Sequence, residues 1–188
     1  MKLSWSHKLF LKINATVGKN KTRDRLMVFG ANWLIVVMVG VVVLYGVVRW
    51  SVGDTNWLLW YLNIFLFVFF WAEVISYLFG LLFRRPRPVV EFPESMQLIK
   101  TMTTWKAFPS DHAITAFLLS GTLFFILPRS LLLIVPMYIA AIGVSVSRVY
   151  AGVHYPRDIV GGFIIAHLML WLVPWFLFDT VESIFHLW

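Results

Sequence analysis

The sequence predicts an all-α protein: a polytopic membrane helix bundle of about five transmembrane helices, preceded by an N-terminal amphipathic interfacial helix. The first reason is composition, because 60% of the 188 residues are hydrophobic and 13% are charged, whereas soluble domains are about 45–50% apolar. The second is that apolar residues gather into runs long enough to cross a bilayer. The third is that charged residues cluster between those runs. We expect residues 1–188 to form a single integral-membrane domain.

The N-terminal segment, residues 1–25, is basic and only weakly apolar. It holds seven Lys or Arg residues among isolated apolar ones, and no run in it is long enough to span a bilayer. This pattern is typical of an amphipathic helix lying on the membrane surface, on which His7 would be a surface residue. We do not expect a cleavable signal peptide, because the apolar run that follows has spanning length and lacks a small-residue cleavage site.

Five apolar segments within residues 26–178 are expected to form the helical bundle. The segment 89–108 between the second and third of them is interpreted as a surface loop and a candidate lid or lipid gate, because loops of that length are uncommon unless they are functional. The expected spans are Leu26–Val48, Trp57–Phe83, Pro109–Leu127, Leu131–Val146 and Ile159–Phe178.

Two bulk properties narrow the chemistry. The sequence has no cysteine, which excludes disulfides, thiolate metal sites and thiol catalysis. The net charge of +7 would suggest nucleic acid as the partner of a soluble protein. Here the basic residues flank apolar spans, so anionic lipid headgroups or phosphates are the expected partners and no nucleic-acid function is predicted.

The stretch SRVYAGVHYPRD, residues 147–158, concentrates titratable groups between two strongly apolar segments. His154 is a candidate nucleophile or general base, Asp158 a carboxylate that could hold its ring, and Arg148 a fixed cation for an anionic substrate. Charges are costly at the bilayer centre, so this stretch is expected at a membrane surface or in a wet pocket near it. Taken alone, it would equally suit an ordinary interfacial loop between two spans.

Two further clusters, RRPRP at residues 84–88 and PSDH at residues 109–112, are expected on the same side of the membrane as this stretch. That side follows from counting crossings from the end of the second span. Two arginines can clamp a phosphate, and a helix that begins at PSDH offers a hydroxyl and free backbone N–H groups to the same oxygens. The residues predicted to converge are Arg87, Ser110, His112, Arg148, His154 and Asp158.

Other titratable residues have two interpretations each. Glu73, inside the second span, is either a carboxylate that supports the site from behind or a packing residue that is protonated or hydrogen-bonded. His167 and His186 are interpreted as packing or interfacial residues.

A metal site is the competing use of the predicted cluster. It would combine His112 and His154 with Asp111 and Asp158. The arginines crowding the cluster would repel a cation, and the spacing is unlike that of H-E-x-x-H ligands. We therefore predict no metal.

With these motifs in place, the chain resembles the type 2 phosphatidic acid phosphatase superfamily of membrane lipid phosphatases. Its signature is K-x6-R-P, then P-S-G-H, then S-R-x5-H-x3-D, and the third part is complete within residues 147–158. The second part has Asp111 where most members have Gly. The first keeps Arg87 and Pro88, while Gly80 occupies the lysine position.

Within that superfamily, P-S-D-H together with L-F-x-x-I-N-A-T at Leu9–Thr16 resembles the bacitracin-resistance subgroup. This resemblance implies hydrolysis of undecaprenyl diphosphate to undecaprenyl phosphate, which recycles the lipid carrier of cell-wall synthesis. Arg84, Arg85 or Lys106 are candidates to make the phosphate contact that the family lysine would make, and Asp111 is a further candidate phosphate-site residue.

The resemblance also implies a mechanism without cofactor. His154 would attack the terminal phosphorus to give a phosphohistidine, Asp158 would orient His154, and His112 would protonate the leaving oxygen. Arg87, Arg148 and Ser110 would hold the phosphoryl oxygens. Phosphatidylglycerophosphate or phosphatidate phosphatase activity is the alternative within the superfamily, and a non-catalytic lipid-binding or transport protein is the alternative of another class.

Two features of the sequence predict opposite orientations in the cell membrane. Of the sixteen Lys and Arg residues, all but Arg49 and Arg129 are expected on the side of the motifs, which the positive-inside rule would make cytoplasmic. The resemblance implies a site on the outer face, and we adopt that as the expectation.

Overall fold

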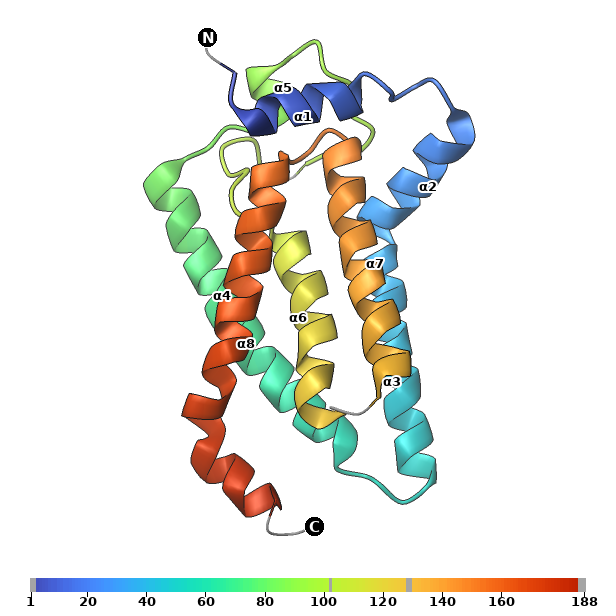
Figure 1. Cartoon of the computed structure of the whole chain (residues 1–188), viewed down its shortest axis with the longest axis vertical. Coiled ribbons are helices and arrows are strands. Elements are labelled where there is room, and N and C mark those ends of the chain that lie inside the picture. Colours follow the sequence, from blue (N-terminus) through green and yellow to red (C-terminus); the bar gives the residue numbers. More distant parts are fainter. Residues whose placement is uncertain (1–2, 102, 128–129, 186–188) are drawn as a thin grey trace.

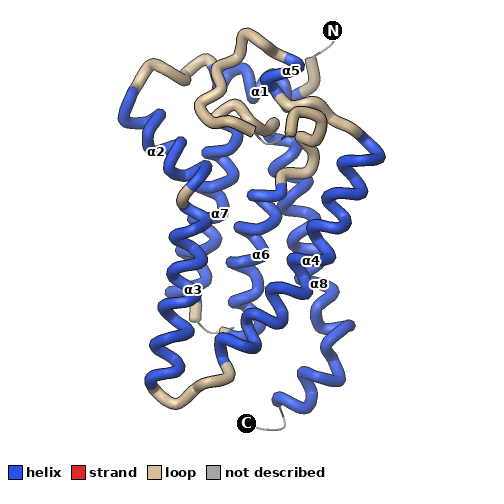
Figure 2. The backbone as a smooth tube through the Cα atoms, turned by 180° about the vertical axis from the view of Figure 1, so that it is seen from behind, coloured by secondary structure: helices blue, strands red, loops and turns tan. Residues whose placement is uncertain are grey.

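The computed structural model describes residues 3–101, 103–127 and 130–185 of the chain. The described residues contain helices and no strands, which confirms the all-α prediction. In chain order they form α1 (Trp5–Asn14), α2 (Lys21–Asn32), α3 (Leu34–Ser51), α4 (Trp57–Phe83), α5 (Pro88–Glu91), α6 (Asp111–Ile126), α7 (Leu131–Tyr150) and α8 (Pro156–Phe185). Long helices stand side by side as a bundle, the short helices α1 and α5 and the longest loops gather at one end, and the α3–α4 turn lies at the other (Figures 1 and 2).

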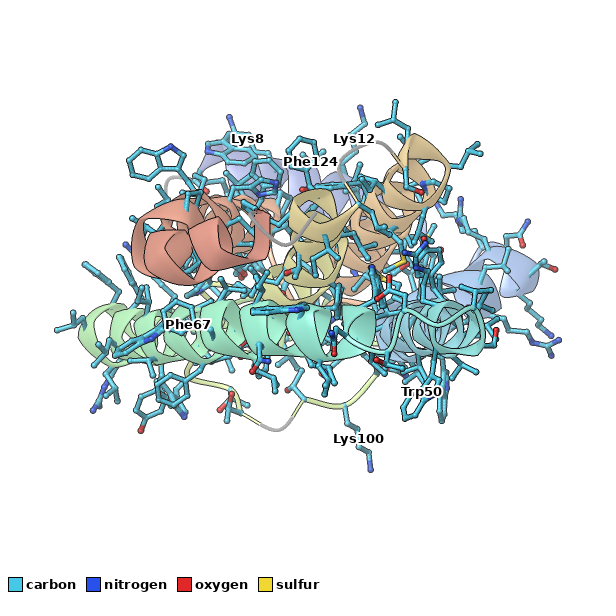
Figure 3. All side chains as sticks on the ribbon, turned by 90° about the horizontal axis from the view of Figure 1, so that it is seen from below. Lys8, Lys12, Trp50, Phe67, Lys100 and Phe124 are labelled. Carbon is cyan, nitrogen blue, oxygen red and sulfur yellow. The ribbon has the colours of Figure 1, made fainter. Side chains whose placement is uncertain are left out.

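In the described part of the chain, four helices, α3, α4, α7 and α8, are long and apolar enough to cross a membrane, and α6 is a shorter apolar helix of 16 residues. Side chains on their outer faces are apolar: Leu132 is 94% exposed and Leu82 77%. Seen along the bundle, Trp50 points outward from it (Figure 3). Apolar outer faces of this kind belong in contact with lipid.

The helix at the centre of the bundle is α6, which packs against α4, α7 and α8 (Figure 1). Ile114, Leu118 and Leu123 on α6 are fully buried. The Tyr61 hydroxyl on α4 donates a 2.8 Å hydrogen bond to the carbonyl of Leu119, which ties the two helices together. A helix packed against several neighbours buries apolar side chains on more than one face, and α6 does so.

The first predicted span, Leu26–Val48, is wrong at its start. The chain breaks at Trp33, so that α2 ends at Asn32 and only α3 has the length of a span. α2 begins earlier than the predicted span, where the Asn20 side chain accepts a 3.0 Å hydrogen bond from the backbone N–H of Arg23 and caps the helix.

At the motif end, α7 runs four residues beyond its predicted limit of Val146 and ends at Tyr150. α8 begins at Pro156, where proline suits the first turn of a helix because it lacks an N–H. Asp158 lies in that first turn, so α8 starts three residues before the predicted span Ile159–Phe178. The stretch 147–158 therefore starts on one helix, crosses a tight loop and ends on the next.

The N-terminal helix α1 lies crosswise over the motif end of the bundle (Figure 1). The prediction that His7 is a surface residue is wrong, because His7 is only 4% exposed and its ring packs against Phe92 and Tyr155. Phe10 is fully buried against the same two rings. One face of α1 is thus docked on the protein, while Lys8 on its other face is exposed.

The segment 89–108 is tied down at several points. Asn14 of α1 exchanges two hydrogen bonds with the backbone of Met96, at 2.7 and 2.9 Å. The N–H of Leu98 donates to the carbonyl of Ala151 at 3.0 Å. The role of the segment 89–108 as a lid or lipid gate remains a prediction.

His167 packs as predicted. It contacts the rings of Phe117 and Phe163, and Tyr138 lies at 3.2 Å from its Nε2. The other predicted packing histidine, His186, lies outside the described residues, as does Arg129.

Candidate active site

The three motifs meet at one end of the bundle, as the count of crossings predicts. Residues 84–88 follow the end of α4, residues 109–112 lead into α6, and residues 147–158 join α7 to α8 (Figure 1). Two backbone hydrogen bonds connect the first cluster to the segment before the second: Arg87 N–H to Thr104 O at 3.1 Å and Ala107 N–H to Arg85 O at 2.8 Å. Segments far apart in sequence therefore form one connected site.

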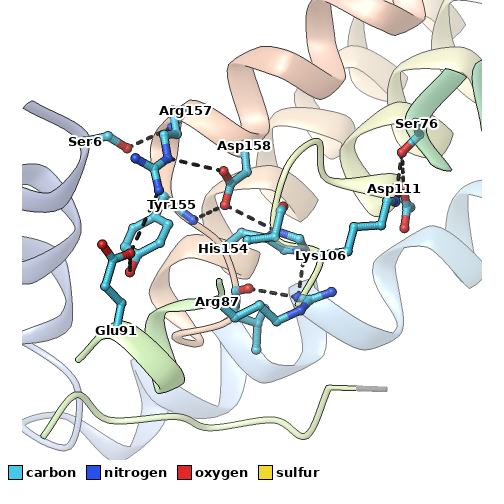
Figure 4. Close-up of polar contacts among 12 residues, drawn as sticks. Ser6, Ser76, Arg87, Glu91, Lys106, Asp111, His154, Tyr155, Arg157 and Asp158 are labelled. Carbon is cyan, nitrogen blue, oxygen red and sulfur yellow. Dashed lines mark hydrogen bonds and ion pairs between the residues drawn. The ribbon is translucent and has the colours of Figure 1, made fainter. Parts of the chain in front are cut away.

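His154 is at the centre of this site and is 2% exposed. Its Nδ1 lies 2.9 Å from the carbonyl oxygen of Ala107, and its Nε2 lies 3.2 Å from Nη1 of Arg87 (Figure 4). A carbonyl can only accept and a guanidinium can only donate, so Nδ1 carries the proton and Nε2 keeps its lone pair. This is the tautomer that a nucleophilic Nε2 requires.

The surroundings also keep the His154 ring neutral. Burial lowers the pKa of His154 well below its usual range, and the positive charges of Arg87 and Arg148 lower it further. The hydrogen bond to the Ala107 carbonyl acts in the opposite direction. A neutral imidazole at neutral pH, with its one proton on Nδ1, follows from these causes.

Asp158 is completely buried but does not hydrogen-bond His154. Its Oδ2 lies 3.6 Å from His154 Nδ1 and instead accepts a 2.7 Å hydrogen bond from the backbone N–H of Tyr155. Its Oδ1 is 3.7 Å from Nε of Arg157. The expectation that Asp158 orients the ring needs correction: the Ala107 carbonyl takes the hydrogen bond, while the Asp158 carboxyl group accepts from the loop N–H of Tyr155 and lies beside Nδ1.

Arg87 and Arg148 are both buried, at 8% and 6% exposed, and neither forms an ion pair with a carboxylate of the described residues. Arg87 Nη1 donates to the carbonyl of Val153 at 2.9 Å, and Arg148 Nη1 to that of Ala31 at 3.2 Å. The Nε atoms of both arginines have no hydrogen-bond partner in the described part of the chain. Two buried cations with unused donors are suited to binding an anion.

Ser110 and His112 are brought to the same place by the start of α6. Ser110 precedes the helix and is fully buried; its backbone N–H donates to the carbonyl of Asp158 at 3.1 Å, and its hydroxyl has no partner among the described residues. His112 lies within electrostatic range of Arg87 and Arg148, and His154 within range of His112. The two imidazoles therefore lie close enough to interact electrostatically at the motif end of the bundle.

Of the other predicted phosphate-site residues, Arg84 and Arg85 are exposed at the end of α4. Lys106, by contrast, is buried and pairs with Asp111 at the start of α6. Glu73 lies within electrostatic range of both members of that pair.

Four contributors were not predicted from the sequence. Three are backbone carbonyls, for which side-chain identity carries no signal: those of Ala31, Ala107 and Val153. The fourth is Ser76, whose Oγ donates to Asp111 at 2.6 Å. The sequence could have indicated Ser76, because it lies three residues after Glu73 and four before Gly80, on the same face of the helix.

Metal binding is the remaining use of such residues. In residues 3–101, 103–127 and 130–185, no group of three or more His, Asp or Glu side chains is arranged to hold a metal ion. In particular, the Lys106 ammonium occupies the oxygen that Asp111 would offer.

Comparison with protein-family models matches residues 57–182 to the PAP2 superfamily. The chain belongs to the PAP2 superfamily. The match covers more than half of the chain and contains all three motifs and every side chain of the site described above. As a superfamily member with multiple apolar helices, it is a multi-pass membrane phosphatase-family protein.

Two similar curated proteins carry the name BcrC. The chain is 30% identical over 104 residues to the bacitracin transport permease protein BcrC of Bacillus licheniformis, covering 55% of this chain and 49% of that protein. It is 31% identical over 93 residues to the undecaprenyl-diphosphatase BcrC of Bacillus subtilis strain 168, covering 50% and 46%. The aligned region spans about half the length of these relatives.

Two crystal structures share the fold. LpxE of Aquifex aeolicus superimposes with a TM-score of 0.69 at 18% identity, covering 91% of this chain and 95% of that one. A transmembrane PAP2 type phosphatidylglycerolphosphate phosphatase from Bacillus subtilis superimposes with a TM-score of 0.53 at 23% identity, covering 91% and 93%. At these identities the likeness establishes the fold of the bundle.

Proposed function

We propose that this protein is a metal-independent lipid phosphatase that releases the terminal phosphate of undecaprenyl diphosphate through a phosphohistidine on His154. The observation that carries the proposal is the state of His154: buried, with an unprotonated Nε2 facing the Arg87 guanidinium. The choice of substrate is supported by the partial similarity to a relative named undecaprenyl-diphosphatase.

In the first step, the Nε2 lone pair of His154 attacks the terminal phosphorus, and the bond from that phosphorus to the bridging oxygen breaks. His112 gives a proton to the bridging oxygen, which leaves on undecaprenyl phosphate. Arg87 and Arg148 hold the phosphoryl oxygens while charge spreads over them.

In the second step, water attacks the phosphohistidine and His112 accepts a proton from it, which releases inorganic phosphate and returns His154 to its neutral form. Between the steps the phosphorylated ring is cationic. Its Nδ1–H remains bonded to the Ala107 carbonyl, and the Asp158 carboxylate 3.6 Å away offsets the charge.

The test is phosphate release by the purified full-length protein in detergent, supplied with undecaprenyl diphosphate and an excess of chelator. We expect turnover with chelator present and at least a 10³-fold loss in the His154→Ala and His112→Ala variants. His167→Gln, a change on α8 away from the site, serves as the control and should retain activity. Normal rates in correctly inserted His154→Ala protein would refute the proposal.

Two alternatives lead to different results in the same assay. A phosphatidylglycerophosphate or phosphatidate phosphatase would turn over those lipids in preference to undecaprenyl diphosphate; the fold shared with a phosphatidylglycerolphosphate phosphatase makes this the second candidate. A lipid-binding or transport protein, as the permease name of one relative suggests, would bind lipid phosphates and release no phosphate.

We also propose that the motif end of the bundle faces the outside of the cell. The support is the partial similarity to an undecaprenyl-diphosphatase, and the opposing signal is the strongly basic segment 1–25. A topology reporter fused to the C-terminus tests this, because α8 starts at the motif end and crosses the membrane away from it. A cytoplasmic reporter agrees with an outward-facing site, and an external reporter contradicts it.

A further inference from the structure

The Lys106 side chain runs across α4 and is held at a fixed place. Its Nζ donates a 2.9 Å hydrogen bond to Ser76 Oγ and pairs with Oδ1 of Asp111. Only 10% of the Lys106 side chain is exposed, whereas 42% of the Asp111 side chain is. The carboxylate thus neutralises a buried ammonium from a position that remains accessible.

Gly80 makes this course possible. A Cβ atom at position 80 would lie 2.8 Å from Cδ, 2.9 Å from Cγ and 3.0 Å from Cε of Lys106. Ser76 and Gly80 are four residues apart and share one face of α4, so the glycine opens the path and the serine receives the ammonium. Any side chain at position 80 would have to displace Lys106.

On one side, this lysine adjoins the segment that holds His154. Lys106 directly precedes Ala107, whose carbonyl holds the His154 ring at 2.9 Å. Asp111, its partner, lies within electrostatic range of Arg87 and Arg148. In Figure 4, Lys106, Asp111 and Ser76 lie beside the His154 and Arg87 cluster, toward α4.

Ser76, which accepts from the Lys106 ammonium, lies one helical turn from an apolar surface of α4. Glu73, which is within electrostatic range of Lys106, lines an open groove formed by apolar side chains of α4 between Leu66 and Leu78. Lys106 therefore connects the residue next to it that holds His154, Ala107, with Ser76, which lies one helical turn from the groove residue Glu73. In a lipid diphosphate, the inner phosphoryl likewise connects the terminal phosphoryl with the hydrocarbon chain.

We infer that Lys106 binds the inner, lipid-linked phosphoryl group of a diphosphate while Arg87 and Arg148 hold the terminal one. This inference rests on the proposed function and adds a residue that selects diphosphates over monophosphates. On binding, the inner phosphoryl replaces Asp111 as the acceptor for the Lys106 ammonium. The same ammonium stabilises the charge that this group gains as it leaves.

The test compares two substrates with the same short chain, farnesyl diphosphate and farnesyl monophosphate. Lys106→Ala should lower kcat/KM for the diphosphate by about 10- to 100-fold, the size expected for one charge-assisted hydrogen bond, and for the monophosphate by less than about threefold. Lys106→Arg should restore part of the loss. Lys100→Ala is the matched control, because Lys100 is exposed on the same segment and points away from the helices (Figure 3).

Equal losses on the two substrates would overturn the inference, because they would mean that Lys106 only supports the fold of the site. Unchanged kinetics would overturn it as well. The proposed function is judged separately, by the wild-type protein: an enzyme that releases no phosphate from either substrate refutes that function whatever the variants do.

A second pair of variants remains informative if Lys106→Ala is poorly folded. Gly80→Ala should displace Lys106 and cause the same loss confined to the diphosphate, whereas Gly40→Ala, with nothing within 4 Å of the added Cβ, should not. In the Lys106→Ala background Gly80→Ala should add no further loss, because the side chain that it displaces is gone. Losses that simply add, or a Gly80→Ala enzyme with unchanged substrate preference, would overturn the inference.

Discussion

The residue on which the chemistry depends is His154, and what matters is which of its nitrogens carries the proton. The Ala107 carbonyl and the Arg87 guanidinium lie at its two ring nitrogens, at 2.9 and 3.2 Å, and together they leave Nε2 free. Burial acts in the same direction by keeping the ring neutral. The Arg87 guanidinium therefore serves two purposes: it keeps the proton off Nε2 of the nucleophile, and it attracts the phosphate.

The protonation of His154 can be measured directly. Its pKa is lowered by burial and by two arginines, so the neutral form should persist as the pH falls through about 6.5, where an unperturbed histidine is half protonated. We expect the ¹⁵N shift of Nε2 in the ligand-free protein to remain that of an unprotonated nitrogen down to pH 6. The signal is assigned by its loss in His154→Gln, and half-protonation at or above pH 6.5 would contradict the account.

The role of Asp158 can be separated from that of the Ala107 carbonyl. Asp158→Asn keeps an oxygen that can accept from the Tyr155 N–H and removes only the charge. Because the carbonyl still fixes the tautomer, we expect kcat to fall by about 10- to 100-fold, rather than the roughly 10⁴-fold loss seen where a carboxylate sets the tautomer. A loss of that larger size would mean that Asp158 orients the ring after all.

At the scale of elements, the break between α2 and α3 supplies part of the site. Ala31 lies in the last turn of α2, where carbonyls have no partner within the helix, and its carbonyl accepts from Arg148. An unbroken helix from Leu26 onward would have used that carbonyl internally. The break thus leaves the Ala31 carbonyl free to bind Arg148 at the end of α7.

The approach of α2 to α7 depends on Gly30. A Cβ atom there would lie 2.2 Å from Ser147 Oγ and 3.0 Å from Ser147 Cβ. Gly30→Ala should therefore push the helices apart, lower stability by about 1–3 kcal/mol, and weaken inhibition by inorganic phosphate because Arg148 is displaced. Thermal melts and phosphate inhibition constants measure both effects, with Gly40→Ala as the control; unchanged values in Gly30→Ala would contradict the packing.

The positions of the helices could be predicted where hydropathy determines them, but their ends could not be predicted where side-chain packing determines them. Apolar runs identified the helices that cross the membrane, but α7 continues past the predicted Val146 because Arg148 is buried against a backbone carbonyl instead of reaching water. Trp33, where the first span breaks, is neither Gly nor Pro and gave no signal. His7 is buried by Phe92 and Tyr155, which are remote in sequence.

At the scale of the whole molecule, the convergence of three motifs at one end follows from alternating crossings of the membrane, which is why counting spans sufficed to predict it (Figure 1). The side chains of the site could also be predicted from the sequence, because charged residues are rare in a membrane protein and therefore stand out. The backbone carbonyls that hold His154 and Arg148 could not, because they depend on how loops from different motifs meet.

The central claim, nucleophilic attack by His154, is tested most directly by rapid-quench labelling. The purified protein is mixed with undecaprenyl diphosphate carrying ³²P in its terminal phosphate, quenched in alkali within one turnover and digested. The account predicts an acid-labile, alkali-stable label on the peptide that contains His154, with none in His154→Gln. Steady turnover by the wild-type protein with no such label at any quench time, or a label that persists in His154→Gln, would contradict it.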